Sequence, residues 1–279
     1  MMIVLRKKLE KLTKREKYMN NKLKTIEMIF RFMDDETKEE VNRYLIDSYK
    51  KDYIELKNEE QVTGMFGEKI NVFLDNLTES KVKDLRSYTG YNYRNINAVL
   101  RNNWNYEING QISDEKVSYY KDMASKISET INLFPCLDYD FKTFRGVSIS
   151  YFKDYGINNV DDLKSLVGKY MYEEGFTSTS IMQKNDFFKK DNELGINYNV
   201  RIIYNIDGSY SDGALLYNDF LTYSVNQSEY IINKCSLSYV NDVVINEDDK
   251  TATIYVTLIP SKIWDVYTKV NKNENRLSV

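Results

Sequence analysis

The first thirty residues have an apolar side chain at every third or fourth position. The stripe consists of Leu5, Leu9, Leu12, Met19, Leu23, Ile26 and Phe30, and Glu16 stands at one position of the same spacing. Alternating steps of four and three place these side chains on one face of a helix. The pattern therefore predicts a long amphipathic helix over residues 1–31, whose apolar face needs a partner.

Helical spacing continues as far as residue 133. We expect a second helix from about residue 34 to 56, a third over 66–77, and further helices between 80 and 133, which Pro135 closes.

After Pro135 the pattern changes to alternation of apolar and polar residues, which is typical of strands. Strands are predicted at 199–206, 229–237, 239–245 and 251–259, the last two joined by the polar turn NEDDK. Helices thus come first and strands second. This order favours an α+β fold over a doubly wound parallel sheet.

Composition narrows the possible chemistry. The chain of 279 residues contains no histidine, which excludes Ser-His-Asp and Cys-His nucleophiles and the usual zinc centres. The two cysteines, Cys136 and Cys235, are too few for a disulfide framework, and we expect both to be buried and reduced. Apolar runs are too short for a membrane helix, so a soluble protein is expected.

The charge is uneven along the chain. The net charge is -3, yet residues 1–31 hold ten Lys or Arg against three Glu. The apolar face of this basic segment could pack on a second copy, on a membrane surface, or on the rest of its own chain. The N-terminus lacks the apolar stretch of a signal peptide. We therefore expect a location in the cytoplasm of the producing cell, or release to a target cell by a route without a signal peptide.

Three short motifs carry the candidate chemistry. They are FRGVSIS with Arg145, entering a strand-like VSIS, FTSTS with Ser178, Thr179 and Ser180, and NQSEY with Gln227 and Glu229. Each motif alone is common, and no glycine-rich phosphate loop accompanies them. Together and in this order they are specific.

With these motifs the sequence resembles the bacterial mono-ADP-ribosyltransferase toxins, namely the C3-like exoenzymes and the related enzyme components of clostridial binary toxins. YTGYNYRNINAVLR at 88–101 is similar to the helical segment that these enzymes place over the NAD pocket, and VRI at 200–202 is similar to their second arginine-bearing strand. The resemblance implies two small, mostly antiparallel sheets packed at a steep angle around an NAD cleft. It also implies NAD as a substrate and no metal. We expect a helical extension over 1–60 and a catalytic domain over 61–279.

The resemblance also implies a role for each motif residue. Glu229 would hold the ribose of NAD and stabilise an oxocarbenium-like transition state, as carboxylates do in glycosidases. Ser178 would orient Glu229, while Thr179 and Ser180 satisfy neighbouring polar groups. Arg145 would bind the diphosphate. Residues expected to complete the NAD site are Gly146, Arg201, Tyr88 and Asn92; for Arg201 a structural ion pair is an equal alternative.

Gln227 is informative about which amino-acid side chain accepts ADP-ribose. In the family, Gln at this position accompanies transfer to asparagine or glutamine, and Glu accompanies transfer to arginine. The resemblance thus implies an Asn or Gln of a Rho-type GTPase, with an arginine of actin as the alternative. A non-catalytic phage or mobile-element protein that keeps the fold is a further alternative. The interval from Ser178 to Glu229 is longer than expected, which predicts an insertion within 184–198 or 207–219.

Overall fold

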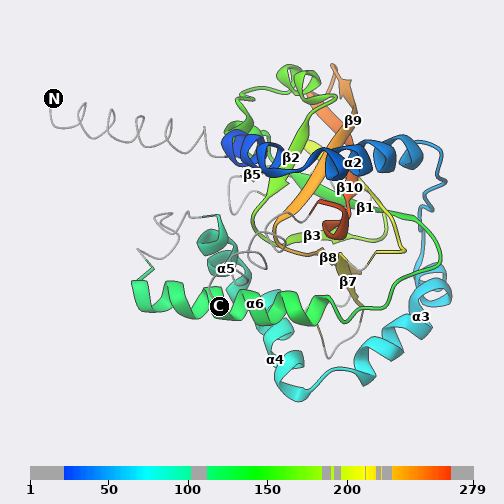
Figure 1. Ribbon diagram of the computed structural model, residues 1–279, viewed down its shortest axis with the longest axis vertical. Helices are drawn as coiled ribbons and strands as arrows, with labels where there is room; N and C mark the ends of the chain where they lie inside the picture. The colour runs from blue at the N-terminus through cyan, green and yellow to red at the C-terminus, as the bar shows by residue number, and fades with distance from the viewer. Residues whose placement is uncertain are drawn as a thin grey trace, which may run out of the picture.

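The computed structural model describes residues 22–101, 112–183, 190–191, 196–210, 212–217, 221 and 228–264. Helices precede the sheet along the chain (Figure 1), which confirms the predicted α+β class. Residues 22–32 are helical. The α-helices that follow are α2 (Asp35–Ser48), α3 (Glu59–Asp75), α4 (Glu79–Ser87), α5 (Tyr93–Leu100), α6 (Asp114–Ile131) and α7 (Ser261–Trp264).

Side-chain caps explain where several helices begin. Asp34, Asn58, Thr78 and Ser113 each accept a hydrogen bond from the backbone N–H three residues further on, at the starts of α2, α3, α4 and α6. The predicted third helix, 66–77, therefore begins too late, because α3 starts directly after Asn58. A π-helical turn, η1 (Tyr88–Asn92), joins α4 to α5.

The predicted second helix is too long. α2 ends at Ser48, and residues further on pair with the sheet instead: Ile54 bridges Phe141 and Leu56 bridges Met182. Their apolar spacing fits a helix, but both side chains belong to an extended segment. This part of the predicted extension therefore lies against the strands.

The strands form an eight-stranded sheet and a separate two-stranded pair. The sheet contains β1 (Phe141–Val147), β2 (Tyr170–Glu173), β3 (Thr177–Ser180), β6 (Val200–Ile206), β7 (Gly213–Leu216), β8 (Glu229–Ile232), β9 (Ser236–Asn246) and β10 (Thr251–Ile259). The pair is β4 (Lys190–Asp191) with β5 (Ile196–Asn197). The order in the sheet is β2-β9-β10-β6-β1-β3-β8-β7, and among the pairings between these eight strands β6–β10 alone is parallel.

The sheet has two parts that meet at β1. β1 pairs with β6 along its whole length but with β3 through one residue pair, Phe144 opposite Ser180. The predicted two small sheets correspond to β2-β9-β10-β6-β1 and β3-β8-β7, which the structure joins. In Figure 1, β3, β8 and β7 lie together, close to α6. The candidate site residues of β1, β3 and β8 lie around this junction.

Two of the four predicted strands are correct. For the other two, 229–237 and 239–245, the predicted boundary between the strands is wrong. β6 and β10 match 199–206 and 251–259. β8 ends at Ile232 and β9 begins at Ser236, because Cys235 adopts a left-handed backbone conformation with φ 57° and turns the chain. VSIS also differs from the prediction, since β1 ends at Val147 and a 3-10 helix, η2 (Ile149–Tyr155), follows. Both cysteines are exposed, contrary to expectation.

The described part of the N-terminal stripe packs on its own chain. Ile29 and Met33 are buried in a small core with α2, the ends of β9 and β10, and Trp264. The ring of Phe30 lies 4.3 Å from that of Tyr170 on β2. Leu23, in contrast, is 41% exposed. Over 22–32 the structure therefore supports the intramolecular alternative, and the rest of the predicted helix lies outside the described residues.

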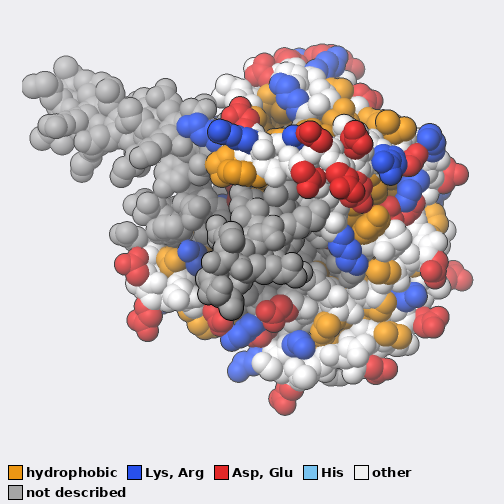
Figure 2. All heavy atoms as spheres, in the orientation of Figure 1, with side chains coloured by type: hydrophobic (Ala, Val, Ile, Leu, Met, Phe, Trp, Pro, Cys, Tyr) orange, Lys and Arg blue, Asp and Glu red, His pale blue; other side chains and the backbone are white. Residues whose placement is uncertain are grey.

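The outer surface of α2 is mostly polar, although Ile46 on it is 60% exposed. On the face seen in Figure 2, acidic and basic side chains are intermixed along this helix. On its inner side Val41 and Leu45 are buried, and the Tyr44 hydroxyl donates to the Leu258 carbonyl at 3.1 Å. Within the described ranges, every helix is too short or too polar to span a bilayer.

Candidate active site

The pairing of β3 with β8 brings Ser178 and Glu229 together. Ser180 lies opposite Glu229 and Ser178 opposite Ile231, so the two serines and Glu229 share one face of this strand pair. Burial raises the pKa of Glu229, and the hydrogen bond from the Ser178 hydroxyl acts in the opposite direction without cancelling the rise. The site thus contains a carboxylate that is costly to ionise and one hydroxyl that favours its charged form.

A chain of hydrogen bonds continues from Ser178 into α5. Tyr88, which is 1% exposed, is hydrogen-bonded to Ser178, and Asn97 Nδ2 donates to the Tyr88 hydroxyl at 3.3 Å. Tyr88 and Ser178 therefore connect Asn97 on α5 with Glu229 on β8. Burial raises the pKa of Tyr88 to about 12, so its phenol keeps its proton at neutral pH.

Asn97 also fixes the start of β3. Its Oδ1 accepts from the Phe176 backbone N–H at 2.9 Å, and its Nδ2 lies 3.4 Å from the Phe176 carbonyl. Gly175 leaves the space for this contact, since a Cβ there would lie 2.7 Å from Asn97 Oδ1. Sequence reasoning missed Asn97, although it lies in the quoted segment 88–101.

The other two hydroxyls of the Ser-Thr-Ser run have structural partners. Thr179 Oγ1 donates to the Tyr230 carbonyl on β8 at 2.7 Å. Ser180 Oγ donates to the Met182 carbonyl at 2.8 Å and accepts from the Met182 N–H at 3.3 Å. The Thr179 contact links β3 to β8, and the Ser180 contact stays within the segment that follows β3.

Arg145 has an unused donor. It lies on β1 next to Gly146, and its guanidinium carbon is 5.4 Å from the centre of the Tyr151 ring. Its Nη1 is buried and has no hydrogen-bond partner. A buried, unpaired guanidinium N–H is costly, so this geometry suits an anionic ligand that supplies the missing acceptor.

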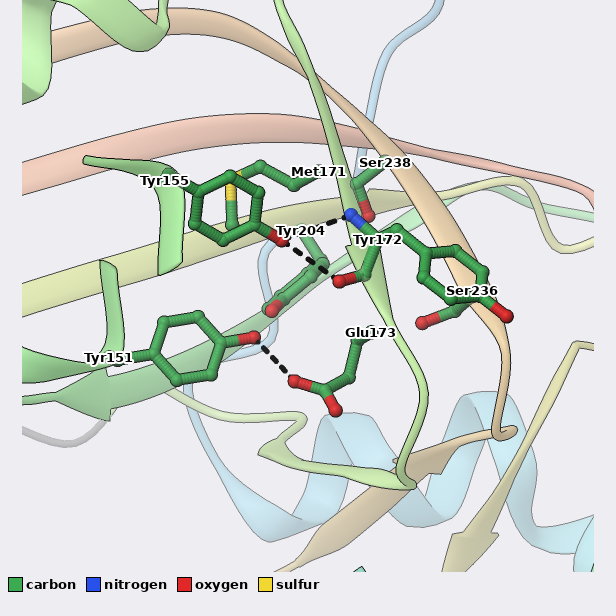
Figure 3. A pocket seen from close by; sticks show the side chains of 8 residues that line it. All are labelled: Tyr151, Tyr155, Met171, Tyr172, Glu173, Tyr204, Ser236 and Ser238. Atoms are coloured by element: carbon green, nitrogen blue, oxygen red, sulfur yellow. Dashed lines mark hydrogen bonds between the residues drawn. The ribbon is translucent and has the colours of Figure 1, made fainter. Parts of the chain in front are cut away.

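A buried carboxylate lies near Arg145. Glu173 Oε1 accepts from Arg101 Nε at 2.7 Å and from the Gly175 N–H at 2.9 Å, and its Oε2 accepts from the Tyr151 hydroxyl at 2.9 Å. Figure 3 shows the Tyr151 hydroxyl directed at this carboxylate from η2. Burial acts to raise the pKa of Glu173, but Lys22, Arg101 and Arg145 together hold it well below its usual range.

Sequence reasoning missed Glu173 and Arg101. A possible signal was the pair of glutamates in EEGFTSTS, placed directly before the buried Phe176.

Arg201 and Asn92, which were also expected in the NAD site, form their hydrogen bonds elsewhere. In the β1–β6 register Arg201 lies opposite Gly146, whereas Arg145 lies opposite Ile202, so the two arginines leave opposite faces of the sheet there. Arg201 Nη2 donates to Thr253 Oγ1 at 3.1 Å. Asn92 Nδ2 donates to Ser87 Oγ at 2.7 Å within its own helical segment. The structure therefore groups Arg145, Ser178, Glu229 and Tyr88, and it does not add Arg201 or Asn92 to them.

Gln227 and most of the predicted insertion interval 184–198 lie outside the described residues. The other interval, 207–219, contains β7. In the described part of the chain no group of three or more Asp, Glu or Cys residues is placed to hold a metal ion.

Comparisons with known proteins agree with this fold. The profile of the ADP-ribosyltransferase exoenzyme family matches residues 13–260. No curated protein matches the chain significantly. Among solved structures, C3stau2 from S. aureus, determined with NAD, has a TM-score of 0.59 at 13% identity and covers 75% of this chain and 99% of its own. The Clostridium limosum C3 exoenzyme has a TM-score of 0.58 at 18% identity, over 76% of this chain and 99% of its own.

A longer toxin shares the fold as well. The ADP-ribosylating toxin BECa, from a binary enterotoxin of C. perfringens, has a TM-score of 0.57 at 19% identity, over 74% of this chain and 50% of its own. Identities this low show a common fold. The profile match covers most of the chain, and the protein belongs to the ADP-ribosyltransferase exoenzyme family.

Proposed function

We propose that the protein is an NAD-dependent mono-ADP-ribosyltransferase that transfers ADP-ribose to a protein side chain. The observation that carries this proposal is the pairing of β3 with β8, which places Ser178 and Glu229 on one face, together with the buried Nη1 of Arg145, which has no hydrogen-bond partner. Membership of the exoenzyme family adds support. The NAD bound in the structure of C3stau2 is consistent with NAD as the substrate.

In the proposed reaction the bond between C1′ of the ribose and the nicotinamide nitrogen breaks, and nicotinamide leaves with the bonding electrons. The ribose then carries positive charge in an oxocarbenium-like state. The Glu229 carboxylate holds the ribose hydroxyl and stabilises this charge, and Ser178 keeps the carboxylate aimed. A nucleophile of the acceptor protein, or water in a side reaction, forms the new bond to C1′.

Arg145 binds the diphosphate of NAD in this proposal. Its planar fork of N–H donors matches phosphate oxygens, and the unpaired Nη1 supplies a donor at no cost to an existing hydrogen bond. Tyr88 lies beside Ser178 at the same site. Gly146, Thr179 and Ser180 complete the proposed site as neighbours of these residues. Arg201 was expected as a second diphosphate contact, but it leaves the opposite face of the sheet from Arg145 and its Nη2 donates to Thr253, so Arg145 alone is proposed for this role.

For the acceptor we propose an asparagine or glutamine of a Rho-type GTPase. Gln227 supports this choice, because an amide side chain can pair with an acceptor amide through one donor and one acceptor. The sequence is the basis for this part of the proposal. We further propose that the catalytic domain extends from about residue 61, with the helical segment before it packed on its sheet, and that the protein acts in a target cell.

The proposal is tested by incubating the purified protein with labelled NAD and a eukaryotic cell lysate. A labelled protein band whose tryptic peptides carry ADP-ribose on Asn or Gln is the expected result. Modification of arginine would contradict the proposed acceptor and favour an actin-type specificity. Nicotinamide release together with the lack of any labelled protein would contradict transfer while leaving NAD cleavage intact.

A further inference from the structure

Lys22 is a buried cation in the helical segment before α2. It is 6% exposed, and its ammonium lies 3.5 Å from Glu173 Oε2 and 3.6 Å from Glu174 Oε2. Burial disfavours its charged form, yet the attraction of Glu173 above all keeps its pKa above the ordinary lysine value. A lysine is rarely so buried without a partner or a function. The N-terminal segment thus supplies a charge to the interior of the sheet region.

The same ammonium and Arg145 approach one aromatic ring. Lys22 Nζ lies 5.3 Å from the centre of the Tyr151 ring, and the Arg145 guanidinium carbon lies 5.4 Å from it. Lys22 is also 5.5 Å from the ring of Tyr155. Figure 3 shows both rings on η2 facing β2, which carries Glu173. Lys22, Arg101 and Arg145 therefore form a single electrostatic unit with Glu173 and the Tyr151 ring.

Glu173 is saturated within this unit. Arg101, Tyr151 and the Gly175 N–H donate to it, and Lys22 lies beside it. In the described part of the chain Arg145 forms no ion pair, and its Nη1 stays without a partner. If Lys22 were neutral, Glu173 would attract its remaining cationic neighbours more strongly, and Arg145 is one of them. The arginine would then turn toward the carboxylate and away from a ligand.

We propose that Lys22 is a positioning residue of the NAD site: by neutralising Glu173 together with Arg101, it keeps Arg145 unpaired and available to the diphosphate. This inference rests on the proposed function, because it assigns the ligand of Arg145 to NAD. It makes the N-terminal helical segment a part of the NAD site.

The test compares Lys22→Met with Lys24→Met in the full-length protein. Lys24 is exposed on the same helical segment and serves as the matched control. NAD affinity is measured by isothermal titration calorimetry, KM and kcat by nicotinamide release, and folding by thermal unfolding. Loss of one charge-assisted contact should raise Kd and KM of Lys22→Met by about ten- to a hundredfold. Its kcat should stay near the wild-type value, and Lys24→Met should bind NAD like the wild type.

A double variant separates positioning from folding. Lys22→Met/Glu173→Gln removes the carboxylate that attracts Arg145, so NAD affinity should recover most of the loss seen in the single variant. A double variant that binds NAD as weakly as Lys22→Met would overturn the inference, even where the single variant is unstable. Tighter NAD binding by Lys22→Met would also overturn it and assign Lys22 an inhibitory role.

If the wild-type protein neither binds nor cleaves NAD, the proposed function fails and the inference with it. If the wild type binds NAD and Lys22→Met binds it equally well, only the role of Lys22 is refuted.

Discussion

Replacing Asn97 by alanine should destabilise the start of β3 and disturb the position of Ser178 beside Glu229, the proposed catalytic carboxylate. The change removes the acceptor of the Phe176 N–H, a hydrogen bond of 2.9 Å, and the donor to the Tyr88 hydroxyl. Phe176 is 1% exposed, so water cannot replace the lost acceptor without a rearrangement. A buried unsatisfied N–H costs roughly 1–3 kcal/mol. A loss of about 2 kcal/mol corresponds to a Tm lower by about 4–8 °C for a domain of this size.

The assays for Asn97→Ala are denaturant unfolding and steady-state nicotinamide release. Asn95→Ala is the control, because Asn95 lies on the same helix and its Nδ2 donates to the Tyr120 hydroxyl on α6 at 3.0 Å. The control should lose some stability but keep kcat. Asn97→Ala should lose stability and also kcat, since Ser178 loses its ordered neighbour Tyr88. Equal stability and equal kcat in the two variants would refute the assignment of Asn97 as the support of β3.

Three further predictions concern single side chains. Ser178→Ala removes a hydrogen bond that favours ionised Glu229, so the pKa of Glu229 should rise further. In the wild type the acid limb of kcat/KM against pH should lie above the ordinary glutamate value of 4.5, and in Ser178→Ala it should move to higher pH. Gly175→Ala places a Cβ 2.7 Å from Asn97 Oδ1 and should destabilise the fold by roughly 1–3 kcal/mol in denaturant unfolding; an unchanged midpoint would show that the two segments separate easily. Gln227→Glu should preserve nicotinamide release while reducing labelled transfer to an asparagine acceptor; equal loss of both would assign Gln227 to bond cleavage.

Periodicity predicted the fold class and the regular elements, and it failed where pairing partners decide the structure. β6 and β10 alternate clearly between apolar and other residues and were placed correctly. Ile54 and Leu56 continue the spacing of a helix, but bridges to Phe141 and Met182 make them extended. The break between β8 and β9 depends on the left-handed conformation of one residue, Cys235, which no hydrophobic pattern reveals.

For the candidate site, sequence motifs pointed to Ser178 and Glu229 but not to the buried ion pairs around Glu173. Ser178 and Glu229 belong to motifs whose order along the chain is informative. Arg101 and Glu173 are 72 residues apart, and Lys22 is more distant still from Glu173, so their ion pairs arise from tertiary packing. Charged residues of this kind are indistinguishable in sequence from solvated ones, because only burial gives them a role.

The central claim is that Glu229 acts on the ribose of NAD during cleavage. It is tested most directly by nicotinamide release from NAD, followed by liquid chromatography, for the wild type, Glu229→Gln and the control Glu60→Gln, whose side chain is exposed on α3. The carboxylate stabilises charge that develops only in the transition state, so Glu229→Gln should lose nicotinamide release while its NAD affinity by calorimetry stays within a few fold of the wild type. The wild type and Glu60→Gln should release nicotinamide at equal rates. A Glu229→Gln variant that keeps a tenth or more of the wild-type rate would contradict the account.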